Sequence, residues 1–137
     1  MQPRVLLADD HPAVLNKVAS LLESTCEIVG KVGDGKTLLE VSASLHPDIL
    51  IIDISMPILS GIEAAQQLKR SGTAAKIIFL TVHEDPDFVQ AALAAGGCGY
   101  VLKSRLATDL ICAIRAALAD LPFVSPSLSP NVTGPSL

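Results

Sequence analysis

The sequence predicts a doubly wound α/β domain, in which a parallel sheet carries helices on both faces. Half of its 137 residues are hydrophobic and only 18% are charged. The longest uncharged stretch before the C-terminal tail, residues 88–102, contains Gln90 and three glycines, so no segment offers the about 20 apolar residues of a membrane-spanning helix. Strands buried on both faces account for such apolar content. The alternation of strand-like and helix-like segments along the chain gives the topology.

Five short segments have the length and the β-branched content of buried strands. They are residues 4–8, 27–32, 48–53, 76–81 and 98–102. Each is followed by polar or turn-forming residues, so each strand has a clear end.

Segments with helical periodicity lie between and after these strands. They are residues 12–24, 36–45, 61–70, 85–95 and 105–120. The first carries an apolar stripe at a spacing of 3.6 residues and has Pro12 in its first turn. Short connections between alternating strands and helices imply right-handed crossovers. We therefore expect a flavodoxin-like (βα)5 domain with five parallel strands in the order 2-1-3-4-5.

The last sixteen residues differ in composition from the rest. Residues 122–137 hold four of the nine prolines and no charged residue. This composition is typical of a linker or a disordered tail. We therefore predict one domain over residues 1–121, followed by a Pro/Ser-rich segment that is too short to fold as an output domain.

Charge and cysteine content narrow the possible functions. Acidic residues outnumber basic ones by 14 to 10, and only 3% of residues are aromatic, so neither a basic nucleic-acid surface nor a base-stacking platform is expected. The three cysteines are an odd number, lie far apart and lack zinc-ligand spacing. They indicate buried thiols of a cytosolic protein.

Polar residues with complementary chemistry follow four of the five strands. Asp9 and Asp10 follow the first, Asp53 ends the third, Thr81 ends the fourth and Lys103 follows the fifth. Ligands of such sheets bind beyond the carboxyl ends of the strands. Three adjacent carboxylates repel one another and favour a bound Mg²⁺. Asp53 is then the expected nucleophile toward a phosphoryl group, whose charge Lys103 would neutralise and which Thr81 would hydrogen-bond.

Longer segments around these residues match a known family. The segments are LLADDHP, DILIIDISMPILSGIEA, IIFLTVHED and GYVLKS. From residue 4 to about residue 121 the chain resembles the receiver domain of a two-component response regulator. The segments DDHP and LTVHED and the end that contains Ser-Pro resemble the NarL/FixJ type. Members of that type usually carry a LuxR-type helix-turn-helix after the receiver.

The resemblance implies a role for each site residue. It implies that Asp53 is the phosphoacceptor and that Asp9 and Asp10 hold Mg²⁺ together with the backbone carbonyl of Ser55. Thr81 and Lys103 would bind the phosphoryl group. Tyr100 matches the aromatic residue that swings inward when the switch threonine moves.

The resemblance also implies a signalling switch rather than an enzyme. A sensor histidine kinase would phosphorylate Asp53, and the surface of residues 85–120 would then change shape. The domain would assist only its own phosphorylation and dephosphorylation, with homodimerisation as a possible consequence. DNA would be contacted through a further C-terminal domain, and no membrane contact is expected. The alternative is a stand-alone receiver that signals through protein contact.

One motif competes with this interpretation. Residues 30–37, GKVGDGKT, match the G-x-x-x-x-G-K-[ST] pattern of a phosphate-binding loop. An NTP-binding enzyme is therefore a remote alternative. An NTP-binding loop would give no role to the polar residues at the strand ends, Asp9, Asp10, Thr81 and Lys103. A turn that enters a helix also explains Gly33 to Gly35 more simply.

Overall fold

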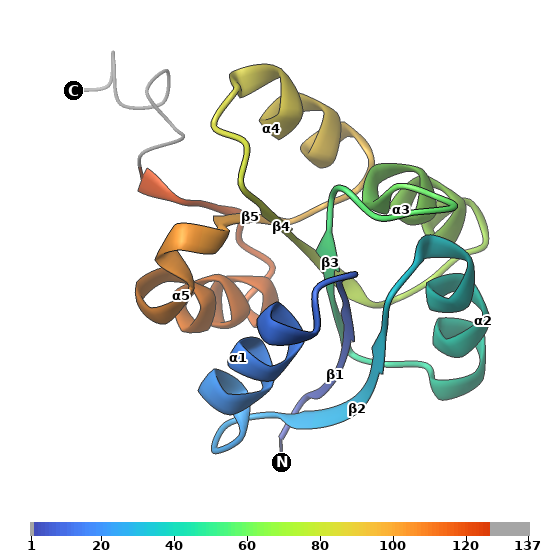
Figure 1. The fold of residues 1–137 in the computed structure, drawn as a ribbon, viewed down its shortest axis with the longest axis horizontal. Coiled ribbons are helices and arrows are strands. Elements are labelled where there is room, and N and C mark those ends of the chain that lie inside the picture. The colour runs from blue at the N-terminus through green and yellow to red at the C-terminus, as the bar shows by residue number, and fades with distance from the viewer. Residues whose placement is uncertain (1, 127–137) are drawn as a thin grey trace.

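The computed structural model describes residues 2–126 as one parallel α/β sheet with helices on both faces (Figure 1). The strands are β1 (Arg4–Ala8), β2 (Glu27–Val32), β3 (Ile49–Asp53), β4 (Lys76–Thr81), β5 (Gly99–Leu102) and β6 (Phe123–Val124). They lie in the order β2-β1-β3-β4-β5-β6, and every neighbouring pair is parallel. The predicted fold class and the order of the first five strands are therefore confirmed.

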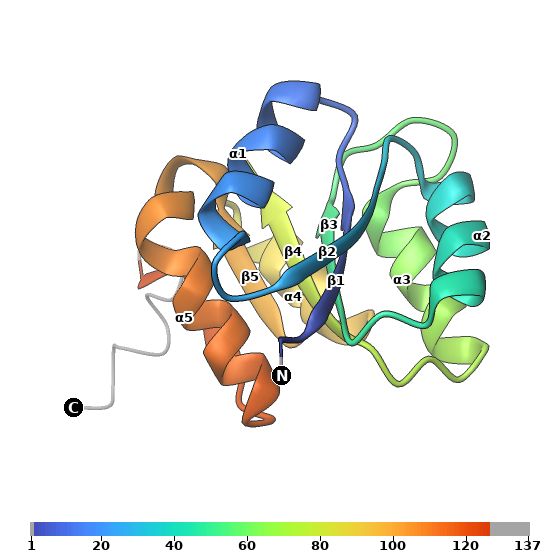
Figure 2. The same cartoon turned by 90° about the horizontal axis from the view of Figure 1, so that it is seen from below.

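The helices divide between the two faces of the sheet. They are α1 (Pro12–Leu22), α2 (Gly35–Leu45), α3 (Gly61–Arg70), α4 (Pro86–Ala94) and α5 (Leu106–Leu118), with a 3-10 turn, η1 (Lys103–Arg105), before α5. Helices α1 and α5 cover one face, and α2, α3 and α4 cover the other (Figures 1 and 2). The two faces of β3 and β4 each contribute buried side chains to a different core cluster, which explains their unbroken apolar sequence.

The sheet contains one strand more than the sequence predicts. Residues Phe123 and Val124 pair in parallel with Gly99 and Tyr100 of β5, although residues 122–137 were expected to form a linker or tail. A two-residue strand in a segment flanked by Pro122 and Pro126 is too short for a recognisable strand pattern, and its pairing depends on the edge of β5. The rest of the expected tail, residues 127–137, lies outside the described residues.

Helix α3 begins directly beside the end of β3. Ser60 and Glu63 form a capping box, in which each side chain accepts a hydrogen bond from the other residue's backbone N–H at 3.2 Å. Gly61 follows, and its N–H donates to the carbonyl of Ile54 at 2.8 Å. A Cβ atom at Gly61 would overlap the carbonyl oxygen of Asp53. Glycine therefore allows α3 to start against the strand that ends in Asp53.

Replacing Gly61 by alanine is expected to lower the free energy of unfolding by about 3 kcal/mol, the upper end of the range for overpacking. The clash is with backbone, which cannot move aside as a flexible side chain could. Urea unfolding measures the effect. Gly33→Ala is the matched control, because the nearest atom to its Cβ would be 3.9 Å away. Equal losses in both variants would show that helix and loop propensities, rather than the contact with Asp53, determine the result.

Candidate phosphoryl and metal site

The structure brings the predicted polar residues together at one edge of the sheet. Asp9 follows β1, Asp53 ends β3, Thr81 ends β4 and Lys103 follows β5. Strands β1 and β3 are neighbours, with Ala8 opposite Ile52. Parallel pairing thus places the carboxylates of Asp9 and Asp53 side by side, as the strand order predicts.

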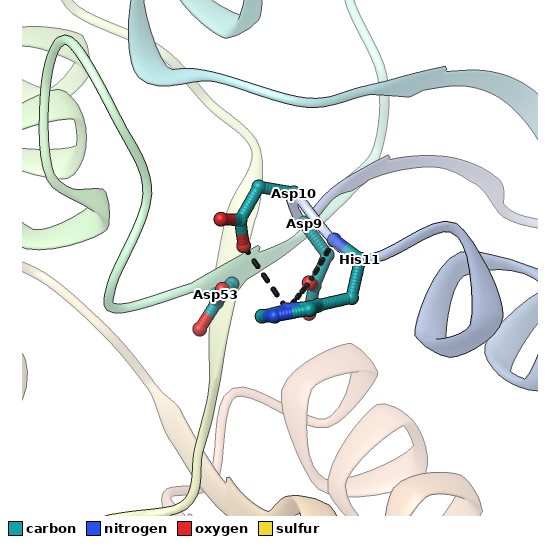
Figure 3. Close-up of side chains that lie close together, drawn as sticks. All are labelled: Asp9, Asp10, His11 and Asp53. Atoms are coloured by element: carbon teal, nitrogen blue, oxygen red, sulfur yellow. Dashed lines mark hydrogen bonds and ion pairs between the residues drawn. The ribbon is translucent and has the colours of Figure 1, made fainter.

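Four side chains form an acidic cluster at this edge (Figure 3). One ligand atom from each of Asp9, Asp10, His11 and Asp53 lies within 4.8 Å of the others. Asp9 and Asp53 are buried, whereas Asp10 and His11 lie at the exposed mouth. The cluster therefore opens to solvent on the side of Asp10 and His11.

The donor set of this cluster fits a hard divalent cation. Both Oδ2 atoms of Asp9 and Asp53 are buried; that of Asp9 lies 2.8 Å from the Lys103 ammonium, whereas that of Asp53 accepts no hydrogen bond among the described residues. Buried carboxylate oxygens without hydrogen bonds are costly unless a cation balances them. Carboxylate oxygens beside a solvent-exposed mouth also suit the partly hydrated Mg²⁺ ion. The acidic pocket could thus hold a metal at Asp9, Asp10 and Asp53.

His11 is a cluster member that sequence reasoning did not include in the site. Its Nδ1 atom lies 3.2 Å from Oδ1 of Asp9 and 3.1 Å from Oδ1 of Asp10. Its backbone N–H also donates to Oδ1 of Asp9 at 2.9 Å. Its place directly after the two aspartates in the DDHP segment is the only sequence signal for this contact.

Lys103 bridges the two buried carboxylates. Its Nζ atom lies 2.8 Å from Oδ2 of Asp9 and 3.3 Å from Oδ1 of Asp53, and the side chain is only 13% exposed. Burial alone would lower the pKa of Lys103, but the adjacent Asp9 and Asp53 outweigh it and raise that pKa above its usual value. The ammonium group therefore stays charged and faces the site.

Asp53 is held in an environment that opposes its ionisation. Burial is the largest cause and the charge of Asp9 the second, and together they raise the pKa of Asp53 to about 6, although Lys103 and the backbone N–H of Ser55 oppose the change. That N–H donates to Oδ1 at 3.2 Å. Oδ1 is thus engaged by Ser55 and Lys103, while Oδ2 remains available.

Thr81 ends β4 and Ser55 lies in the loop after β3, and both residues contact His83. The hydroxyl oxygen of Thr81 accepts the backbone N–H of His83 at 2.9 Å. The His83 ring stacks on Phe88 with centroids 4.2 Å apart, and its Nε2 atom lies 3.5 Å from Oγ of Ser55. His83 thereby joins the loop after β4 to the loop after β3.

Tyr100 points into the protein rather than into solvent. Its side chain is fully buried, and its hydroxyl donates to the carbonyl of His83 at 3.5 Å. Burial is the main cause that raises the pKa of Tyr100. The inward orientation places the ring of the predicted switch residue below the same loop that Thr81 begins.

The alternative phosphate-binding loop is contradicted by the structure. Gly30 lies within β2, paired with Leu6 of β1, and does not begin a loop. The N-terminus of α2 is occupied by Asp34, whose carboxylate accepts the backbone N–H of Thr37 at 2.7 Å and its hydroxyl at 3.0 Å. An acidic side chain therefore caps the Thr37 amide and places negative charge at the helix N-terminus where a phosphate would bind.

A broader surface hollow lies at the opposite end of the sheet. It is lined by residues that include Leu39, Ser42, Gln67 and Lys76. None of the predicted site residues contributes to it, so the chemistry at the ends of β1 and β3 is separate from this hollow. Among residues 2–126, no helix has the length and apolar character needed to cross a membrane.

Comparison with known proteins agrees with this geometry. A model of the response regulator receiver domain family matches residues 5–115. The transcriptional regulatory protein LiaR of Bacillus subtilis (strain 168) is 37% identical over 131 residues, which cover 94% of this chain and 62% of LiaR. The chain spans 53 to 66% of the length of the curated relatives it matches.

Solved structures show the same fold along nearly the whole chain. The two-component response regulator of the LuxR family from Aurantimonas sp. SI85-9A1 superposes with a TM-score of 0.91 and 31% identity, and the match covers 98% of this chain and 97% of that one. The isolated receiver domain of RcsB from Salmonella enterica serovar Typhimurium was solved with the phosphomimetic BeF3−. It superposes with a TM-score of 0.86 and 33% identity, and the match covers 94% of this chain and 97% of that one. RcsB has also been solved in complex with DNA. The chain therefore belongs to the receiver domain family of two-component response regulators, of the LuxR (NarL/FixJ) type.

Proposed function

We propose that Asp53 is the phosphoacceptor of a Mg²⁺-dependent signalling switch. The observation that carries the proposal is the Oδ2 atom of Asp53, which is buried, accepts no hydrogen bond among the described residues and lies in an acidic cluster beside Lys103. A carboxylate oxygen that is free to form a bond, next to a fixed positive charge, is suited to attack phosphorus.

The transfer breaks one bond and forms another. Oδ2 of Asp53 attacks the phosphorus of a phosphohistidine or of a small acyl phosphate, and the P–N or P–O bond to the donor breaks, with its electron pair leaving on the donor. Lys103 neutralises charge on the transferred group, and the Thr81 hydroxyl can donate its hydrogen to a phosphoryl oxygen. Asp9, Asp10 and the Ser55 carbonyl would hold the Mg²⁺, which stabilises negative charge on the phosphoryl oxygens.

We further propose that phosphorylation changes the surface formed by α4, β5 and α5. Thr81 ends β4, next to β5 in the sheet, Tyr100 lies on β5, and both residues contact His83. Movement of Thr81 toward a phosphoryl group would therefore alter the packing below α4. The DNA complex of RcsB and the transcriptional names of the relatives support control of a LuxR-type DNA-binding domain, with a sensor histidine kinase as donor.

Phosphorylation with acetyl phosphate tests the assignment. The wild-type chain is expected to gain the mass of one phosphoryl group when Mg²⁺ is present and not when the cation is chelated. Asp53→Asn is expected to gain none, because an amide oxygen is a poor nucleophile. Asp87→Asn removes an exposed carboxylate on α4 and should behave as wild type. Unchanged labelling of Asp53→Asn would refute the proposal.

A further inference from the structure

The chain that leaves α5 folds back onto the outer edge of the sheet. Strand β6 runs parallel to β5 (Figure 1), with the N–H of Phe123 donating to the carbonyl of Cys98 and the N–H of Ser125 to that of Tyr100, both at 3.0 Å. The segment thus covers the edge of the strand that carries Tyr100 and leads into Lys103.

Ser125 fastens this segment with its side chain as well as its backbone. The residue is fully buried. Its hydroxyl oxygen accepts the backbone N–H of Leu102 at 3.1 Å, and its hydrogen is donated to Oδ2 of Asp109 at 2.7 Å. One hydroxyl therefore joins the outgoing chain, β5 and α5.

Asp109 is a buried charge with a complete set of partners. It is 4% exposed, and Arg105 donates to its two oxygens at 2.8 and 3.3 Å. Burial opposes ionisation of this carboxyl, but the hydrogen bonds from Arg105 and Ser125 outweigh it and hold the pKa of Asp109 below its usual value. If one partner is lost from such a network, a buried polar group is left without a hydrogen bond, which costs free energy. The network therefore favours the one arrangement in which all of its members are paired.

The network ends one residue from the phosphoryl site. Leu102, whose N–H Ser125 holds, is followed directly by Lys103, whose ammonium bridges Asp9 and Asp53. Any shift of Leu102 relative to α5 moves the backbone of Lys103. It therefore changes the position of the Lys103 ammonium relative to the Asp53 carboxylate. Ser125 also fixes the carbonyl of Tyr100, two residues earlier on the same strand.

We propose that Ser125 and Asp109 are positioning residues that form a latch between the outgoing chain and Lys103. The inference rests on the proposed role of Asp53. Reciprocity then applies: a ligand that changes the pairing of Lys103 at Asp53 changes the docking of residues 123–125 by the same free energy, and the reverse. The latch thereby connects phosphorylation to the segment through which a following domain would be attached.

Two readouts on the 137-residue chain test the latch, both at a temperature at which each variant is fully folded. The first is amide hydrogen exchange at Leu102 and at residues 123–125 without ligand. The second is the apparent affinity for BeF3− in the presence of Mg²⁺. Ser125→Ala is expected to raise exchange at Leu102 and to weaken BeF3− binding, each by about tenfold, the factor for one lost hydrogen bond. Ser71→Ala is the matched control, because it removes a serine hydroxyl that bonds only the end of α3.

The outcomes separate the latch from its premise. A variant that exchanges faster at Leu102 yet binds BeF3− like wild type would reduce Ser125 to a structural role and overturn the inference. If wild type takes neither BeF3− nor a phosphoryl group, the proposed function itself fails, whatever the exchange data show. If Ser125→Ala does not fold, Asp109→Asn takes its place, because it keeps the side-chain shape. It is likewise expected to exchange faster at Leu102 and to bind BeF3− more weakly. Faster exchange with BeF3− binding like that of wild type would again overturn the inference.

Discussion

Lys103→Met is expected to lower the free energy of unfolding of the metal-free protein by about 3 to 5 kcal/mol at pH 7, the range for removing one partner of a buried ion pair. Methionine fills a similar volume but leaves Asp9 and Asp53 as adjacent buried carboxylates without a balancing charge. Urea unfolding measures the loss. Mg²⁺ is expected to recover part of it, because the cation supplies positive charge to the same oxygens.

The size of this loss in unfolding free energy depends on pH and on whether the lysine is buried or at the surface. It should be smaller at pH 5, because the pKa of Asp53 is about 6 and its carboxyl is then mostly protonated. Lys76→Met is the matched control, since Lys76 pairs with the exposed Asp120 at the surface and such pairs contribute little. Equal losses in the two lysine variants would contradict the account of Lys103 as the charge that balances the site.

Asp53→Asn is expected to stabilise the metal-free protein at neutral pH. The pKa of Asp53 is about 6 in the folded protein against an ordinary 3.8, so the folded state binds the proton more tightly than the unfolded state. The proton therefore favours folding most below pH 4, and this contribution is lost as pH rises through 6. The difference corresponds to at most about 3 kcal/mol at pH 7.

The measurement compares variant and wild type by urea unfolding between pH 4 and pH 7.5 in the presence of a chelator. The stability gain of Asp53→Asn should grow from near zero at pH 4 to its maximum above pH 6. Glu40→Gln, which removes an exposed carboxylate on α2, should give a flat difference. A variant that is less stable than wild type at pH 7 would mean that Lys103 stabilises the Asp53 charge more than burial and Asp9 oppose it.

The fold could be predicted from sequence because its signals are local. All five expected strands have the observed bounds or differ by one residue, since each apolar segment ends at a polar or turn residue. The edge at which Asp9, Asp53, Thr81 and Lys103 meet also follows from parallel pairing and strand order. The family assignment adds the confirmed receiver identity to that geometry.

The features that sequence reasoning missed depend on distant contacts. Strand β6 forms because the edge of β5 and the carboxylate of Asp109 lie where Ser125 can reach them. His83 meets Ser55 because two loops from different strands converge. No periodicity or spacing within either segment encodes these contacts, so only the folded arrangement makes them visible.

The most direct measurement of the central claim locates the phosphoryl group on the chain. The protein is incubated with acetyl phosphate and Mg²⁺ and then treated with borohydride, which reduces an aspartyl phosphate to homoserine. Peptide mass spectrometry then identifies the reduced residue. Reduction is expected at Asp53 and at no other carboxylate. Reduction at Asp9, Asp10 or any other residue, with Asp53 unmodified, would contradict the central claim.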